Sequence, residues 1–154
     1  MNPSEIQQVT AGFGARFPKL FEKLGAANLE VLLKAASLVD VPKERTLFRD
    51  RMPVDFLYFV VDGNLSAYIE SEGVSRQIGI IHPGEWLGEV SMLSGEPQAT
   101  ATVIADSECR VIKMHRVAFE KLIDENEAIA TALLNQFIEL MAARLRKPII
   151  SVTV

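Results

Sequence analysis

Short apolar runs separated by tight-turn dipeptides fill the middle of this sequence, from Arg45 to Met114. Phe56 to Val61 is continuously apolar, and Leu65 to Ile69 resumes after Asp62-Gly63, a dipeptide that tolerates the positive φ of a hairpin turn. Further turns are predicted at Glu72-Gly73, Pro83-Gly84 and Asp106-Ser107, the last between a pair of strands at Val103–Ala105 and Cys109–Met114. Turns that recur roughly every ten residues are typical of an antiparallel β-barrel or jelly roll.

Helical patterns precede this β region. Residues 1–17 are polar and contain glycine, which predicts a loose helical arm. A short apolar helix at Leu20–Leu24 is expected to end at Gly25, and Asn28 is expected to cap the next helix. In that next helix the apolar residues recur with helical spacing, at Leu29, Leu32, Leu33 and Ala36.

The C-terminal segment is predicted to be helical, with an interruption near Asp124–Asn126. Its long second part carries two apolar stripes, one of Ile129, Leu133, Phe137 and Leu140 and one of Leu134, Ile138, Met141 and Leu145. Together the stripes are wider than one packing partner needs. They fit either a single broad face on the barrel or a second stripe that meets another subunit. We favour a homodimer through this helix, because two-fold dimers are common.

One domain accounts for the length and composition. A chain of 154 residues with 49% apolar and 23% charged residues can bury a core of ordinary size. We divide it into an N-terminal arm at 1–17, a domain at 18–147 and a tail at 148–154. Within the domain, the barrel is expected at 43–115 and the C-terminal helices at 117–147.

Charge and targeting signals favour a cytoplasmic protein. The net charge of −4 and the pI near 5.2 give no basic surface for nucleic acid or anionic lipid. The first residues lack a signal-peptide pattern, and no stretch approaches the roughly 18 apolar residues of a spanning helix. The single cysteine, Cys109, fits a reducing compartment and is predicted to lie in the core. We therefore expect no membrane partner.

The sequence offers no pattern for covalent chemistry or a metal. His82 and His115, with one cysteine, give no zinc spacing, and each is predicted to be a surface or structural residue. Ser91 and His115 could join an aspartate in a triad, but Ser91 lacks a nucleophile-elbow sequence. Gly12-Phe13-Gly14 lacks the third glycine of a dinucleotide-binding loop. We therefore expect neither an enzyme nor a cofactor.

The segment from Trp86 to Pro97 indicates a binding loop. Gly88 has no Cβ and lets the backbone approach a ligand closely. Glu89 to Leu93 is long enough for one or two helical turns, whose first N–H groups can face an anion. The Glu89 carboxylate could accept hydrogen bonds from a sugar hydroxyl. An ordinary connector, with Glu89 favouring the helix dipole, explains the same residues.

Several motifs resemble the cyclic-nucleotide-binding domain of catabolite-activator-type regulators, kinase regulatory subunits and gated channels. Leu47–Asp50 followed by Asp55–Gly63 is similar to the first long hairpin of that family. His82–Glu89 is similar to the "PGxxFGE" start of its phosphate-binding cassette, and Ala101–Val103 to the cassette's end. The resemblance covers about residues 18–147. It implies a mainly β fold: an antiparallel jelly-roll barrel (a double-stranded β-helix) with N-terminal helices and a long C-terminal helix.

The resemblance also implies roles for individual residues. Gly88 and the backbone around Val90 and Ser91 would line a cyclic phosphate, and Glu89 would hold the ribose 2′-hydroxyl. Thr100 or Thr102 would lie near the phosphate or the base. The helix Asn126–Lys147 would close over the base and form the dimer seam.

The sequence departs from the family at the phosphate site. The family places an arginine nine residues after the glutamate, and Gln98 stands there; if the extra residue before Thr102 is placed earlier, Ala99 takes the position. Neither supplies a cation, although a shifted loop could bring Arg76 or Arg110 toward the pocket. Two loop glycines common in the family are replaced by Arg51 and Val54, so this turn is expected to differ or to carry strain.

Three functions fit these residues. The first is a regulatory, signal-transducing module that senses a cyclic nucleotide, which shifts the long C-terminal helix. Because Gln98 supplies no cation, we expect cyclic AMP itself to bind weakly or not at all. The second is a degenerate domain that dimerises and binds an unidentified protein partner without a nucleotide. The third is the sensor half of a transcription regulator. Because the chain ends at Val154 without a helix-turn-helix, we expect no DNA binding by this chain alone.

Overall fold

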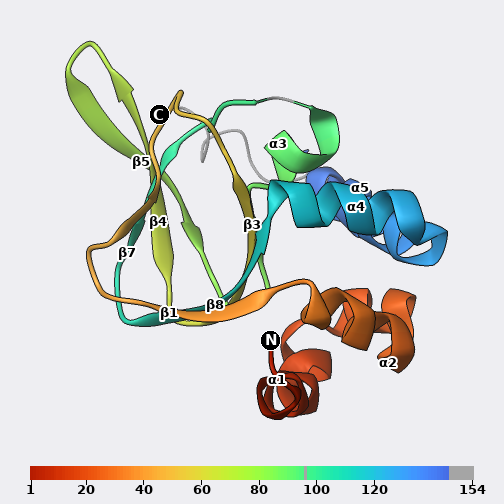
Figure 1. Cartoon of the computed structure of the whole chain (residues 1–154). Coiled ribbons are helices and arrows are strands. Elements are labelled where there is room, and N and C mark those ends of the chain that lie inside the picture. Colours follow the sequence, from red (N-terminus) through yellow and green to blue (C-terminus); the bar gives the residue numbers. More distant parts are fainter. Residues whose placement is uncertain (96, 146–154) are drawn as a thin grey trace.

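The computed structural model describes residues 1–95 and 97–145, which form eight strands and five helices. The strands are β1 (Ser37–Val41), β2 (Thr46–Phe48), β3 (Phe56–Asp62), β4 (Leu65–Ser71), β5 (Val74–Ile81), β6 (Trp86–Leu87), β7 (Thr102–Ala105) and β8 (Cys109–His115). The helices are α1 (Pro3–Arg16), α2 (Pro18–Lys34), α3 (Glu89–Ser94), α4 (Arg116–Glu125) and α5 (Glu127–Leu145). Figure 1 shows the strands on one side of the molecule and α1, α2, α4 and α5 together on the other.

Two antiparallel sheets make up the β part. Their strand orders are β1-β8-β3-β6 and β2-β7-β4-β5. Strands that follow one another in sequence therefore alternate between the sheets, except β4 and β5, which is the arrangement of an eight-stranded jelly roll. The predicted mainly β fold with flanking helices is confirmed.

Two of the predicted hairpins are wrong, although the turns themselves are present. The Asp62-Gly63 turn joins β3 to β4, and Asp106-Ser107 joins β7 to β8, but each pair is divided between the two sheets. Only the Glu72-Gly73 turn closes a hairpin, in which Ser71 of β4 faces Val74 of β5. A turn dipeptide fixes where the chain reverses, whereas the burial of both strand faces decides which strands pair.

The sequence interpretation missed β1 and therefore began the strands too late, at Arg45. Ser37–Val41 pairs antiparallel with β8 along its whole length. Only Val41 of this strand is buried, so its sequence shows little of the alternation by which a half-buried strand is recognised.

The sequence of β3 is continuously apolar because both faces of this strand are covered. Leu57 and Phe59 belong to a core shared with the helices, whereas Tyr58 and Val60 belong to the core between the sheets. Cys109 of β8 lies in the second core, as predicted, and burial raises the pKa of its thiol. The core between the sheets and the helical core thus share β3 and β8 as a common wall.

The N-terminal helices are packed into the helical core, so the expected loose arm is wrong. Asn2 and Glu5 form a capping box at the start of α1, whose Val9 and Phe13 are buried. Helix α2 has a kink at Gly25, where the sequence predicted an end. Asn28 does not cap a new helix there; its side-chain amide donates to the Leu24 carbonyl at 3.0 Å, on the other side of the kink.

The predicted interruption of the C-terminal helices is confirmed at Asn126, whose side chain accepts a hydrogen bond from Ile129 N at 3.0 Å. Helix α5 packs against α2 and α4, and Ile129 and Leu133 of its first stripe are fully buried in the core that the helices share with β3 and β8. The second stripe is open: Leu134 is 48% exposed and Ile138 55%. The side chain of Leu145 and the predicted tail at 148–154 lie outside the described residues.

Among the helices described, none has the length and apolar character needed to cross a membrane.

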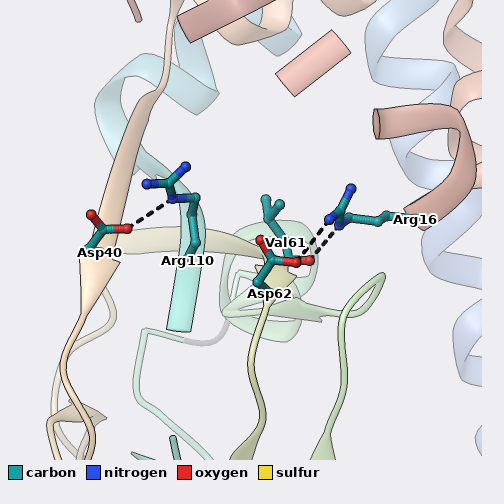
Figure 2. A network of polar contacts seen from close by, with 5 residues as sticks. All are labelled: Arg16, Asp40, Val61, Asp62 and Arg110. Atoms are coloured by element: carbon teal, nitrogen blue, oxygen red, sulfur yellow. Dashed lines mark hydrogen bonds and ion pairs between the residues drawn. The ribbon is translucent and has the colours of Figure 1, made fainter. Parts of the chain in front are cut away.

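A polar network holds α1 on the end of β3 (Figure 2). Arg16 Nε donates to the Val61 carbonyl at 2.7 Å, and Arg16 Nη2 donates to Asp62 Oδ1 at 2.9 Å. The β3–β8 register shifts between Val60 and Asp62, so Val61 sits in a bulge whose carbonyl is available to the arginine. Arg110 of β8 lies nearby and pairs with Asp40 at 2.9 Å.

We expect Arg16→Ala to lower the free energy of unfolding by about 1–3 kcal/mol, because it removes the donor to a partly buried carbonyl. Arg110→Ala is the matched control: it removes the same side chain from the same region, but Arg110 makes only an exposed ion pair, so little change is expected. Urea unfolding of both variants and wild type measures the difference. Equal losses in the two variants would contradict a specific role of the Arg16–Val61 bond.

Candidate ligand-binding site

A cavity of about 590 Å³ opens beside α3, within the range of small-molecule sites. Residues of β2, β4, β5, β6, α3 and β7 line it, together with the loops before β3 and β7. Most of these residues are apolar, among them Val54, Ala67, Leu87 and Val103, and the polar ones are Glu85, Glu89, Ser91, Gln98 and Thr100. A second cavity, of about 90 Å³, borders the network of Figure 2 and has room for only a few water molecules.

Gly88 fixes the geometry where β6 gives way to α3. Its φ of 86° is left-handed, and a Cβ at this position would lie 2.5 Å from the Phe56 carbonyl oxygen. The sequence interpretation expected the missing side chain to make room for a ligand. The structure gives a different reason, because the space that a Cβ would need is occupied by the protein's own β3 backbone.

Helix α3 brings two buried polar residues to the cavity wall. Glu89 is 5% exposed and Ser91 is 3% exposed, and both line the cavity together with Val90. The predicted ligand-binding residues Gly88, Glu89, Val90 and Ser91 therefore lie together.

Arg116, the first residue of α4, lies next to this wall and was missed by the sequence interpretation. Its Nη2 donates to Ser91 Oγ at 2.6 Å and to the Val54 carbonyl at 2.7 Å. An arginine after a strand that ends at His115 looks like an ordinary surface residue in the sequence. Only the tertiary structure brings it to Ser91, which is 25 residues away along the chain.

The loop that carries Gln98 is held by backbone pairing with the segment before β3. Ala99 N donates to the Met52 carbonyl at 2.8 Å, and Arg51 N donates to the Ala99 carbonyl at 2.9 Å. Gln98 and Pro53 form an isolated antiparallel β-bridge. Gln98 is exposed and lines the cavity, whereas Ala99 is 9% exposed. Arg51 adopts a φ of 68°, so the expected strain in this turn is present at a residue where glycine would be free of it.

Other predicted site residues divide between the cavity and its surroundings. Thr100 lines the cavity, but Thr102 does not: its Oγ1 accepts a hydrogen bond from Asp50 N at 3.0 Å. Arg110 belongs to the network of Figure 2, and the exposed Arg76 of β5 is not among the lining residues. The described part of the lining contains no lysine or arginine.

The two histidines have the structural roles that the sequence indicated. His115 Nδ1 caps α4 by accepting a hydrogen bond from Val117 N at 3.1 Å. His82 Nδ1 lies 3.2 Å from Asn64 Oδ1 at the surface. Ser91 is bonded to Arg116 instead of His115, so a serine–histidine pair is not assembled here.

The amino-acid sequence resembles those of known proteins. The family model "Cyclic nucleotide-binding domain" matches residues 38–126. A cyclic nucleotide-gated potassium channel from Mesorhizobium japonicum is 32% identical over 111 residues, which are 72% of this chain and 29% of the channel. The chain spans less than a third of the curated channel relatives that it matches.

Solved structures agree in fold. The catabolite activator protein of Thermus thermophilus has a TM-score of 0.69 at 25% identity, covering 83% of this chain and 58% of that protein. A cyclic nucleotide-binding domain from Methylobacillus flagellatus has a TM-score of 0.75 at 20% identity, covering 90% and 80% of the two chains. The family match alone covers more than half of the residues, and the chain belongs to the cyclic nucleotide-binding domain family.

Proposed function

We propose that this chain is a regulatory domain that binds a cyclic nucleotide in the cavity beside α3. The observation that carries the proposal is the cavity itself: about 590 Å³, mostly apolar, with the buried carboxyl of Glu89 and the buried hydroxyl of Ser91 on one wall. Apolar walls suit the faces of a purine base, and a few fixed polar groups suit a ribose and its phosphate. Membership of the family supports the same ligand class.

In this proposal each polar residue has one task. Glu89 accepts hydrogen bonds from the ribose 2′-hydroxyl, and the backbone of Gly88, Val90 and Ser91 faces the cyclic phosphate. Gln98, Ala99 and Thr100 form the opposite side of the ligand. Thr102 drops out of the set, because it lies outside the cavity. The domain performs no catalytic step, and ligand binding is its whole chemistry.

Gln98 sets the affinity. It is exposed and lines the cavity, yet a neutral amide offers a phosphate no net charge. An arginine side chain from the same loop would add a charge-assisted, bidentate pair worth about 1.5–3 kcal/mol. We therefore propose weak binding in the wild-type domain.

We expect Gln98→Arg to strengthen the binding of cyclic AMP by about 10- to 100-fold, measured by isothermal titration calorimetry. Gln7→Arg, on an exposed position of α1, makes the same residue change away from the cavity and is expected to leave the affinity unchanged. If the wild-type domain binds cyclic AMP with a micromolar or lower dissociation constant and Gln98→Arg does not lower it further, this account of the phosphate site is refuted.

The exposed stripe of α5 supports a second part of the proposal, a homodimer through this helix. Leu134 and Ile138 lie one helical turn apart and are about half exposed, and Met141 continues the stripe as a partly buried residue. In the neighbouring stripe Ile129 and Leu133 are already fully buried in the helical core. A second copy of α5 would cover the open stripe with the same apolar residues, as a two-fold interface requires.

The open stripe also favours the alternative of a domain that dimerises or binds a protein partner without a nucleotide.

Ile138→Glu is expected to convert the dimer to a monomer, because it places a charge in the middle of the apolar stripe. Ala128→Glu adds the same charge to an exposed position of α5 outside the stripe, and this variant should remain dimeric. Light scattering at tens of micromolar protein reads out both. A wild-type monomer under these conditions would end the dimer proposal and leave the ligand proposal intact.

A further inference from the structure

The charged residues that line the described part of the cavity are both acidic. They are Glu85 and Glu89, and no lysine or arginine joins them. Among these described lining residues an anionic ligand therefore meets carboxylates and no cation. If a cyclic phosphate binds here, a positive charge has to act from behind the wall.

Arg116 lies directly behind that wall. Its guanidinium contacts two residues that line the cavity, through the Val54 carbonyl at 2.7 Å and the Ser91 hydroxyl at 2.6 Å. It is partly buried, and its backbone is tied to the start of β3 by a hydrogen bond from Arg116 N to the Asp55 carbonyl at 2.7 Å. Two acceptors thus hold the guanidinium, and a third hydrogen bond holds the backbone of the same residue.

Arg116 forms no ion pair with the described residues. The other arginines with side-chain contacts, Arg16 and Arg110, each pair with an aspartate. Both side-chain partners of Arg116 are neutral, and no carboxylate in the described ranges forms an ion pair with it. Its positive charge therefore lies next to the cavity wall without a bound carboxylate among the described residues.

The hydrogen bond from Arg116 leaves the Ser91 hydroxyl proton available to a ligand. A guanidinium has only donors, so Ser91 Oγ must accept from it, and the hydroxyl proton is left to donate elsewhere. Within the described residues Ser91 Oγ donates to no other group, although the side chain is 3% exposed. The guanidinium also polarises this hydroxyl and makes its proton a stronger donor.

We propose that Arg116, acting through Ser91, is the cation of the phosphate site and replaces the charge that Gln98 and Ala99 lack. The proposal rests on the proposed function, since it assumes a cyclic nucleotide in this cavity. Ser91 donates to a phosphate oxygen, and Arg116 positions and polarises Ser91 without touching the ligand. The pair makes the site select the charged cyclic nucleotide over a neutral nucleoside of the same base.

Titration of cyclic AMP and adenosine, at concentrations up to millimolar, tests this selectivity. Arg116→Gln keeps a donor for the Val54 carbonyl but removes the charge, and we expect it to weaken cyclic AMP binding about tenfold while adenosine binding changes less than about twofold. Arg116→Lys should retain most of the preference for cyclic AMP, and Ser91→Ala should lose it. Arg110→Gln, the matched control, removes one positive charge from a residue that does not line the cavity and should change neither affinity.

The outcomes separate this proposal from the proposed function. Cyclic AMP binding that is equal in wild type and Arg116→Gln overturns the role of Arg116 and leaves the ligand proposal standing. Equal losses for cyclic AMP and adenosine overturn it as well, since they indicate a structural role. If neither ligand binds to wild type or to Gln98→Arg, the proposed function fails and this inference fails with it. Should Arg116→Gln unfold, as circular dichroism would show, Ser91→Ala and Arg116→Lys decide the question alone.

Discussion

Burial of β3 and β8 on both faces is the constraint on which the rest of the molecule depends. Phe59 and Ile112 face the helices, and Val60 and Val111 face the second sheet, and all four are fully buried. A strand that is covered on one face only would leave half of these side chains in water. The helices on one side and the second sheet on the other are therefore both required. The cavity develops where that second sheet meets β6 and α3 beside this shared wall.

Strand β8 of this wall also leads the chain to the helix whose first residue contacts the cavity lining. Strand β8 ends at His115, and α4 begins at Arg116, so the chain leaves the sheet at the residue that bonds to Ser91 of α3. Val54, at the start of the segment leading into β3, is bonded to the same guanidinium. A shift of α3 relative to β3 would therefore act on the first turn of α4. Arg116 thus links the cavity wall to the start of α4, which packs against α5.

The sequence was informative where one local signal decides the structure, and it failed where the outcome depends on distant partners. Turn dipeptides located the chain reversals, and Asn126 marked the break between α4 and α5, because both depend on local backbone preferences. The pairing of β3 with β8 rather than β4, and the strand β1, depend on which faces are buried, which no short window contains. The cavity residues from Gly88 to Thr100 were found through a family resemblance. Arg116 departs from no pattern and emerged only from its contacts.

The energetic cost of Arg116 gives its charge a meaning beyond the fold. The fold needs a donor for the Val54 carbonyl and for Ser91, and a neutral amide side chain would provide one at a lower desolvation cost. Among the described residues, the partly buried guanidinium contacts only neutral groups, and this costs more because two neutral acceptors compensate less desolvation than a carboxylate would. In the proposed binding mode, an anion in the cavity on the far side of Ser91 offsets that cost, since the charge then gains the partner that no described residue supplies. On the proposed role of Arg116, the chain retains some affinity for an anion despite Gln98, and an arginine at position 98 would add a second cation directly beside the ligand. The backbone of the loop at 97–99 pairs with the segment at 51–54.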